Sequence, residues 1–271
     1  MKVSRSATAV LLPFIRRIWV ADVADGGMHA RERVLPTGLM HLALRLSGAP
    51  LIVFSDSRGA EGESAGMAVV GGARASSYVR ALSSGRSVGM QIQPGAARLL
   101  FGAPADALAE RHTSLGDVWG GDATELRERL ASIDDPAAVL EAFEQFLMTR
   151  LPRVHGVDPA IAYALDRFRR SVPVKEVVGQ IGWSHRRFID RFRETVGMSP
   201  KRFCRVRRLA RVLRLAGQEP GTSLANLAVD AGYSDQPHFT REFRELTGMA
   251  PGEYREAKPI APHHVPLRPA R

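Results

Sequence analysis

Cysteine is almost absent from this chain: Cys204 is the only one among 271 residues. A single cysteine excludes an intrachain disulfide and supplies too few ligands for a cysteine-based zinc site. The histidines of the first half, His29, His41 and His112, are scattered without metal-ligand spacing. We therefore expect no metal site, and we expect these histidines to be structural or exposed.

A GxSxG nucleophile motif is also missing, which argues against a serine hydrolase. Residues 1–150 hold no cysteine, so a cysteine nucleophile in that half is excluded. An enzyme regulated by DNA is the alternative from another class of function, and no set of residues favours it. We expect the protein to be no enzyme and to need no cofactor.

Long apolar runs are absent as well. A membrane-spanning helix needs about 18 or more consecutive apolar residues, and no stretch approaches that length. The basic N-terminal segment, MKVSRSATAVLLPFIRRIW, lacks both a long apolar core and a clear small-residue cleavage site. The sequence therefore predicts a cytoplasmic protein with no membrane partner.

Positive charge, by contrast, is in excess in the second half. Residues 1–150 contain 16 Lys and Arg and 16 Asp and Glu, so they carry no net charge. Residues 151–271 contain 22 Lys and Arg against 12 Asp and Glu, which accounts for the whole formal charge of +10. This asymmetry indicates a neutral domain joined to one that binds a polyanion, whose phosphates arginine and lysine would neutralise with release of counterions.

The second half also contains one pattern twice. The first copy ends IGWSHRRFIDRFRETVGMSPKRF at residues 181–203, and the second ends AGYSDQPHFTREFRELTGMAPGEY at residues 231–254. The offset between matching residues is 50 before the phenylalanines and 51 after them. We place the extra residue at Pro237, in the turn or the first helical turn. Each copy is typical of a helix-turn-helix, whose second helix enters the DNA major groove.

Apolar spacing predicts which face of each second helix is buried. Each has a pair of phenylalanines at i and i+4: Phe188 and Phe192, then Phe239 and Phe243. A glycine ends the preceding helix, and a serine two residues later is the expected N-cap: Gly182 and Ser184 in the first copy, Gly232 and Ser234 in the second. The opposite face of each helix must point outward.

The outward residues differ between the copies while the buried ones match, which predicts two readers of different DNA sequences. Arginine bonds guanine, glutamine pairs with adenine, and aspartate accepts from cytosine. We therefore expect base contacts from these four residues: Arg186, Asp190, Gln236 and Arg241. Two arginines farther along the helices, Arg193 and Arg244, are better placed for phosphate.

These features resemble the AraC/XylS-type transcription regulators. The resemblance covers residues 158–258, and the second copy carries it as GYSDQPHFTREFRELTGMAPGEYR, residues 232–255. It implies a seven-helix domain that bends DNA and reads two successive major grooves. By this resemblance the base-reading residues are Arg186, Ile189, Asp190, Gln236, His238, Thr240 and Arg241. We assign phosphate contacts to Ser184, Arg187, Arg193, Ser234 and Arg244.

Ile189 departs from the polar reader that is usual in the family. It either touches a thymine methyl group or packs within the protein.

Residues 11–100 contain short apolar runs broken by Gly, Ser and Pro, which predicts antiparallel strands in a barrel or sandwich. Helical spacing follows at 122–133 and 135–151, with an apolar stripe that is either core or a dimer contact. The segments at 32–46 and 68–78 resemble an uncharacterised sensor-type domain that precedes this DNA-binding domain in the family. A ligand-binding or dimerisation role, with a cupin-like fold, is what that resemblance implies.

We therefore predict an α+β protein with a β-rich, cupin-like N-terminal domain and an all-α double helix-turn-helix domain. The expected divisions are a regulatory or dimerisation domain at 1–151, a linker at 152–159, the DNA-binding domain at 160–258 and a disordered tail at 259–271. The tail prediction rests on four prolines among thirteen residues.

The expected partners are double-stranded DNA, an unidentified small-molecule effector and a second copy of the chain, with RNA polymerase as a further candidate. The alternative is a DNA-binding regulator without an effector, whose first domain serves only to dimerise.

Overall fold

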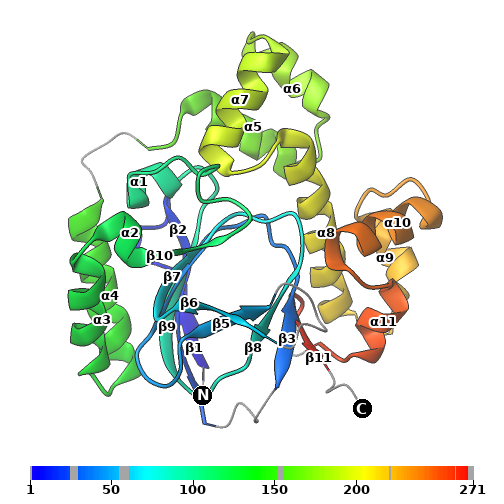
Figure 1. The fold of residues 1–271 in the computed structure, drawn as a ribbon. Coiled ribbons are helices and arrows are strands. Elements are labelled where there is room, and N and C mark those ends of the chain that lie inside the picture. Colours follow the sequence, from blue (N-terminus) through cyan, green and yellow to red (C-terminus); the bar gives the residue numbers. More distant parts are fainter. Residues whose placement is uncertain are drawn as a thin grey trace.

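Strands occupy the first part of the chain and helices most of the rest (Figure 1). The computed structural model describes residues 2–24, 30–54, 61–151, 156–219, 221–259 and 261–267. The strands are β1 Lys2–Arg5, β2 Ile15–Val23, β3 Arg31–Val34, β4 His41–Arg45, β5 Leu51–Phe54, β6 Glu63–Gly66, β7 Ala68–Gly71, β8 Tyr78–Ala81, β9 Gly85–Ile92, β10 His112–Ser114 and β11 His264–Leu267. The helices are α1 Ala97–Phe101, α2 Leu115–Trp119, α3 Asp122–Ala131, α4 Pro136–Arg150, α5 Pro159–Arg169, α6 Val174–Ile181, α7 His185–Val196, α8 Pro200–Gln218, α9 Leu224–Asp230, α10 Gln236–Thr247 and α11 Pro251–Glu256.

The strands form two antiparallel sheets, as the short, punctuated apolar runs predict. One sheet has the order β1-β2-β9-β4-β7-β10 and the other β11-β3-β8-β5-β6. In the first sheet β4 lies between β9 and β7, with Leu42 opposite Met90 and Val70. The β-rich domain followed by helices is the predicted fold class.

Alternation along the central strands gives the first sheet two different faces. Side chains of a strand point to opposite sides in turn, so a period of two separates the faces. On β4, Leu42 and Leu44 are fully buried, whereas His41, Ala43 and Arg45 line a cavity between the sheets. The apolar face carries the core of the domain, and α4 packs on β2.

α4 begins and ends where the sequence predicts. Asp135 caps its N-terminus by accepting from the backbone N–H of Ala138 at 3.0 Å, and Pro136 is its first residue. Its apolar stripe, Val139, Leu140, Phe143 and Leu147, is buried in the core of this chain. The stripe is therefore used for packing within the chain, the first of the two alternatives that the sequence allowed.

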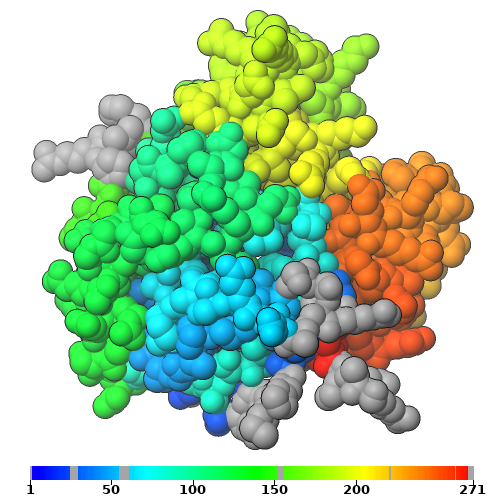
Figure 2. Space-filling view, viewed as in Figure 1, coloured from blue at the N-terminus to red at the C-terminus, as the bar shows by residue number. Residues whose placement is uncertain are grey.

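The C-terminal helices form two helix-turn-helix units joined by the long helix α8 (Figure 1). In the space-filling view the first unit, in yellow-green and yellow, lies at the top and the second, in orange, at the right, with the N-terminal domain below the first and to the left of the second (Figure 2). Apolar spacing in the sequence predicts helices at 174–181, 200–216 and 251–256. The bounds of α6 and α11 agree to the residue, and α8 continues two residues further than predicted.

The predicted disorder of the tail is wrong for residues 261–267. Strand β11 pairs antiparallel with β3, so that Val265 lies opposite Arg33 and is fully buried. The reason is tertiary: β3 is otherwise an edge of the second sheet, and a tail strand satisfies its backbone groups. Pro266 fits here because β11 is itself an edge strand. Residues 152–155 of the predicted linker and 268–271 of the predicted tail lie outside the described residues.

Both helix-turn-helix units end against the N-terminal domain. At the end of α7, the Glu194 carbonyl accepts from the Ala105 N–H at 2.8 Å, and the Glu194 carboxylate pairs with Arg98. At the end of α10, the Thr247 carbonyl accepts from Ser77 Oγ at 2.8 Å and from Arg33 at 3.4 Å. The N-terminal domain therefore contacts the same part of each repeat.

Candidate nucleic-acid interface

The helix α7 is held by its caps and its aromatic face. Ser184 is the N-cap, as predicted: its Oγ accepts from the Arg187 N–H at 3.3 Å. Gly197 ends the helix in the left-handed conformation, with φ of 89°. Phe192 is fully buried, and its ring centroid lies 5.6 Å from those of Phe168 and Phe203. This packing fixes the helix with its polar face outward.

The residues predicted to contact DNA from the first copy, apart from the cap Ser184, lie on α7. The Arg186 side chain is 94% exposed and lies 3.9 Å from Asp190, which is 68% exposed, in an i,i+4 pair. Arg187 lies over the Trp183 ring at 4.6 Å. Ile189 is half-buried, so the structure gives this residue a partial packing role. Arg193 is exposed.

The N-cap of α10 lies one residue later than the sequence predicts. Asp235, not Ser234, is the N-cap: its carboxylate accepts from the His238 N–H at 2.7 Å. The extra residue of the second copy therefore lies in the turn before α10 and not at Pro237, where the sequence predicts it, and α7 and α10 have the same length of 12 residues. Pro237 is the second residue of the helix, where an N–H has no partner within the helix. Proline is thus tolerated there without loss of a hydrogen bond.

The outward face of α10 is a shallow, open hollow. Most of the residues predicted to contact bases and phosphate from this helix line it together with Pro237: Gln236, Thr240, Arg241 and Arg244. Arg241 and Arg244 are exposed and, within the described part of the chain, have no carboxylate within ion-pair distance. Two arginines free of protein partners and one turn apart leave their charge available to an anionic ligand.

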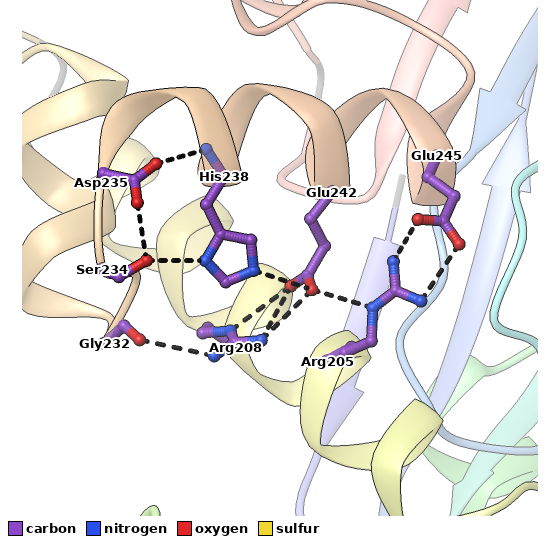
Figure 3. Close-up of polar contacts among 8 residues, drawn as sticks. All are labelled: Arg205, Arg208, Gly232, Ser234, Asp235, His238, Glu242 and Glu245. Atoms are coloured by element: carbon purple, nitrogen blue, oxygen red, sulfur yellow. Dashed lines mark hydrogen bonds and ion pairs between the residues drawn. The ribbon is translucent and has the colours of Figure 1, made fainter.

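His238 lies elsewhere from the other predicted base readers. Its Nδ1 is 3.1 Å from the Ser234 Oγ, and its Nε2 is 3.7 Å from the Glu242 carboxylate (Figure 3). The ring also packs edge-on to Tyr233, with centroids 5.5 Å apart. The side chain is half-buried and has protein partners on both nitrogens, unlike that of Arg241.

Glu242 is a central residue that the sequence reasoning missed. It is buried, and its carboxylate accepts from Arg205 at 2.8 Å and from Arg208 at 3.2 Å, both on α8 (Figure 3). Glu245, one turn further on, pairs with Arg205 at the surface. These ion pairs connect α10 to α8. The corresponding residue of the first copy is Arg191, which pairs with Asp158 instead. Comparison of the two copies therefore gives no sign that Glu242 joins α10 to α8.

Three further features concern metal ligands, membrane-spanning helices and the single cysteine. Within the residues that the structure describes, no group of three His, Cys, Asp or Glu side chains is arranged to hold a metal ion. None of the helices in those ranges is long and apolar enough to cross a membrane. Cys204 lies on α8, and burial raises the pKa of its thiol to about 11.

Two known families match the two halves of the chain. Residues 168–257 match the family described as a helix-turn-helix domain, and residues 6–114 match a domain of unknown function (DUF6597). A putative AraC-like transcription regulator of Streptomyces lividans is 31% identical over 106 residues, 36% of this chain and 34% of that protein. An uncharacterized HTH-type transcriptional regulator of Haemophilus influenzae is 34% identical over 74 residues, 27% of this chain and 24% of that protein. The chain thus spans a third or less of these relatives.

Among solved structures, ToxT from Vibrio cholerae aligns with a TM-score of 0.47 and 10% identity, over 94% of this chain and 98% of that one. The structure of unsaturated fatty acid bound wild-type ToxT aligns with a TM-score of 0.44 and 11% identity, over 94% of each chain. Residues 168–257 belong to the AraC/XylS-type helix-turn-helix domains, and the chain joins this domain to an N-terminal domain of unknown function.

Proposed function

We propose that the protein is a sequence-specific DNA-binding transcription regulator that reads two successive major grooves with α7 and α10. The observation that carries this proposal is the pair of equal, capped helices with matching buried faces and different exposed faces. An exposed arginine side chain in the first turns of such a helix is suited to base edges, and one farther along is suited to phosphate. The basic charge of residues 151–271 supports the same assignment.

The spacing of the two helices predicts the form of the DNA site. α8 has 19 residues, which is about 28 Å at ~1.5 Å per residue. With the turns at each end, this length suits two recognition helices about one turn of DNA apart, roughly 34 Å or 10 base pairs. We therefore expect a site of two unlike boxes on one face of the duplex.

In vitro selection of DNA with the full-length protein tests the proposal. The expected result is two boxes of different sequence, about 10 base pairs apart centre to centre. Recovery of one short box per chain would show that one helix-turn-helix does not read DNA. Failure of the folded protein to bind any duplex at low salt would refute DNA binding itself.

Control by a small molecule at the N-terminal domain is the second part of the proposal. It is favoured over a purely dimerising domain by the cavity of about 260 Å³ between the two sheets. A domain whose interior is filled by side chains would favour dimerisation alone. Homodimer formation and contact with RNA polymerase stay predictions, and the size of the protein in solution tests the first of them.

A further inference from the structure

The cavity between the sheets has an apolar part and a strongly cationic part. Trp19, Leu39 and Met40 are among its apolar lining residues. Five basic side chains also line it: Lys2, Arg17, Arg45, Arg74 and Arg80. Four of them come from β1, β2, β4 and β8, and Arg74 lies in the segment before β8. Because strand side chains alternate, Arg45 and Arg80 point into the cavity while their neighbours Leu44 and Val79 are buried. Lys2 and Arg17 line the cavity while remaining exposed to solvent.

Among the residues that the structure describes, carboxylates neutralise one of these cations. Arg80 pairs with Glu32 at 2.5 Å, and Glu32 is 3% exposed. Burial opposes ionisation of Glu32, but the hydrogen bond from His264 and the charge of Arg80 lower its pKa to about 2. Within the described ranges, no carboxylate lies within 4 Å of the Lys2, Arg17, Arg45 or Arg74 side-chain nitrogens.

Arg74 is the least satisfied of the four. Its Nε is buried and has no hydrogen-bond partner in the described part of the chain. Its guanidinium lies 4.9 Å from the Tyr78 ring centroid, and one nitrogen lies 3.3 Å from His112 Nδ1. Burial, followed by the charge of Arg74, lowers the pKa of His112 to about 4, so this imidazole is neutral at pH 7. A half-buried guanidinium with a neutral imidazole beside it and an unused buried donor is suited to a carboxylate or phosphate oxygen.

The C-terminal tail forms one wall of this cavity. His263 and His264 line it, and His264 Nδ1 is 3.2 Å from the Glu32 carboxylate. The tail is tied to α11 as well, because the Tyr254 hydroxyl donates to the Pro262 carbonyl at 3.0 Å. At the His263 side, the cavity shares lining residues, Arg17 and Leu39 among them, with a larger groove of about 830 Å³ between β2 and α8.

We propose that this cavity binds a small organic anion, with Arg74 and Arg17 at the charged group and the apolar lining around the body, and that the ligand acts on α10 through the walls of its site. The second half of this inference rests on the proposed DNA-binding function. The cavity is small for a ligand pocket, since such pockets commonly measure roughly 300–1,000 Å³, so the ligand is of modest size.

The walls of the cavity connect it directly to the second helix-turn-helix. β8 contributes Tyr78 to the lining, and the preceding Ser77 holds the Thr247 carbonyl at the end of α10. β3 contributes Val34, and the preceding Arg33 donates to the same carbonyl. A ligand that shifts β3, β8 or the tail therefore alters how α10 is held. The end of α7 contacts Ala105 and Arg98, which lie outside this cavity.

Binding of matched charged and neutral probes to the full-length protein tests the anion site. The probes are hexanoate and 4-phenylbutyrate, their neutral counterparts hexanamide and 4-phenylbutyramide, and inorganic phosphate as an anion without an apolar body. We expect at least one carboxylate to bind with a Kd at least tenfold below that of its amide and that of phosphate, as measured by calorimetry. Equal binding of acid and amide, or no binding of either acid at millimolar concentration, would overturn the proposal.

Variants locate the site. Arg74→Met keeps the length of the side chain and removes its charge, and we expect it to raise the Kd of the carboxylate at least tenfold. Arg129→Met, on the exposed face of α3, is the matched control and should leave the Kd unchanged. Val265→Asp should displace the tail and weaken carboxylate binding. If that variant does not fold, His264→Gln tests the contribution of the tail instead. Unchanged binding in folded His264→Gln and Val265→Asp would remove the tail from the site.

The regulatory half is tested separately with the selected DNA. We expect the bound carboxylate to change affinity mainly for the box read by α10 and to leave the box read by α7 nearly unaffected. An equal effect on both boxes, or none, would refute coupling through the cavity walls while leaving the anion site intact. Carboxylate binding without any DNA binding would instead refute the proposed function.

Discussion

At the scale of single residues, burial separates two glutamates of α10 that share one arginine. Glu242 is 5% exposed and Glu245 is 63% exposed in their side chains, and both pair with Arg205. An exposed ion pair contributes little because water and salt screen it. A buried carboxylate with two guanidinium partners is different, since its loss leaves those charges partly buried and uncompensated.

We predict that Glu242→Gln lowers the free energy of unfolding by about 2–4 kcal/mol, as measured by urea denaturation. Glu245→Gln is the matched control and should cost no more than about 1 kcal/mol. Equal losses in the two variants would mean that burial of Glu242 does not matter to the attachment of α10.

The arginines of α10 allow a second prediction at this scale. Arg241→Ala should weaken the selected DNA by about 1–3 kcal/mol and relax the preference at one base pair. Arg244→Ala should weaken all sequences alike and reduce the slope of log K against log salt by about one ion. Binding assays at several salt concentrations, with selected and scrambled duplexes, measure both effects. If Arg241→Ala lowers the affinity for DNA without changing the base preference, the assignment of Arg241 to a base contact is refuted.

At the scale of elements, the ends of the helices carry the contacts between the domains. Gly182 and Gly197 both have positive φ, 75° and 89°. An added Cβ at Gly182 meets nothing within 4 Å, whereas one at Gly197 lies 3.1 Å from the Ala105 carbonyl oxygen and the Ala73 side chain. The two sites therefore share backbone strain, and only Gly197 adds a collision with the N-terminal domain.

We predict that Gly182→Ala costs about 1–2 kcal/mol of unfolding free energy, from strain alone. Gly197→Ala should cost more than Gly182→Ala, because the end of α7 must also move away from the N-terminal domain. Urea denaturation of the two variants gives the comparison. A smaller loss of unfolding free energy in Gly197→Ala than in Gly182→Ala would show that the end of α7 moves away from the N-terminal domain without destabilising the protein.

At the scale of the whole molecule, three half-buried histidines make stability depend on pH. Burial, with smaller contributions from nearby positive groups, lowers the pKa of His41 to about 3, and burial likewise lowers those of His112 and His263 to about 4. An unfolded histidine titrates near 6.5, so between pH 6.5 and 4 the unfolded state binds more protons than the folded state. Stability is then lost as the pH falls below about 6.5. Glu32, whose pKa is lowered to about 2, stays ionised in both states over most of this range.

We predict that unfolding free energy falls between pH 7.5 and pH 5, by up to about 2 kcal/mol for each of these histidines. His41→Gln should reduce that dependence on pH, and the exposed His185→Gln is the control that should preserve it. Denaturation curves at the two pH values measure the effect. Equal stability of the parent protein at both values would contradict the burial of neutral histidines.

The sequence by itself determined the helical part of this protein and its family. Helices form through contacts within a few residues, so apolar spacing, the cap Ser184 and the glycine Gly182 are readable along the chain. The repeat added a second, independent copy of the same signals. The outward faces of α7 and α10 follow from this spacing, and their contacts with DNA remain predictions.

Tertiary structure decided what depends on distant residues. β11 pairs with β3 across more than two hundred residues, and nothing in the proline-rich tail indicates the edge that it covers. Glu242 looks like an exposed helical glutamate until Arg205 and Arg208 of α8 are placed against it. Four of the five cations of the cavity come from strands scattered along the chain. Strand pairing is non-local, so only the packing of the two sheets brings these residues to one cavity.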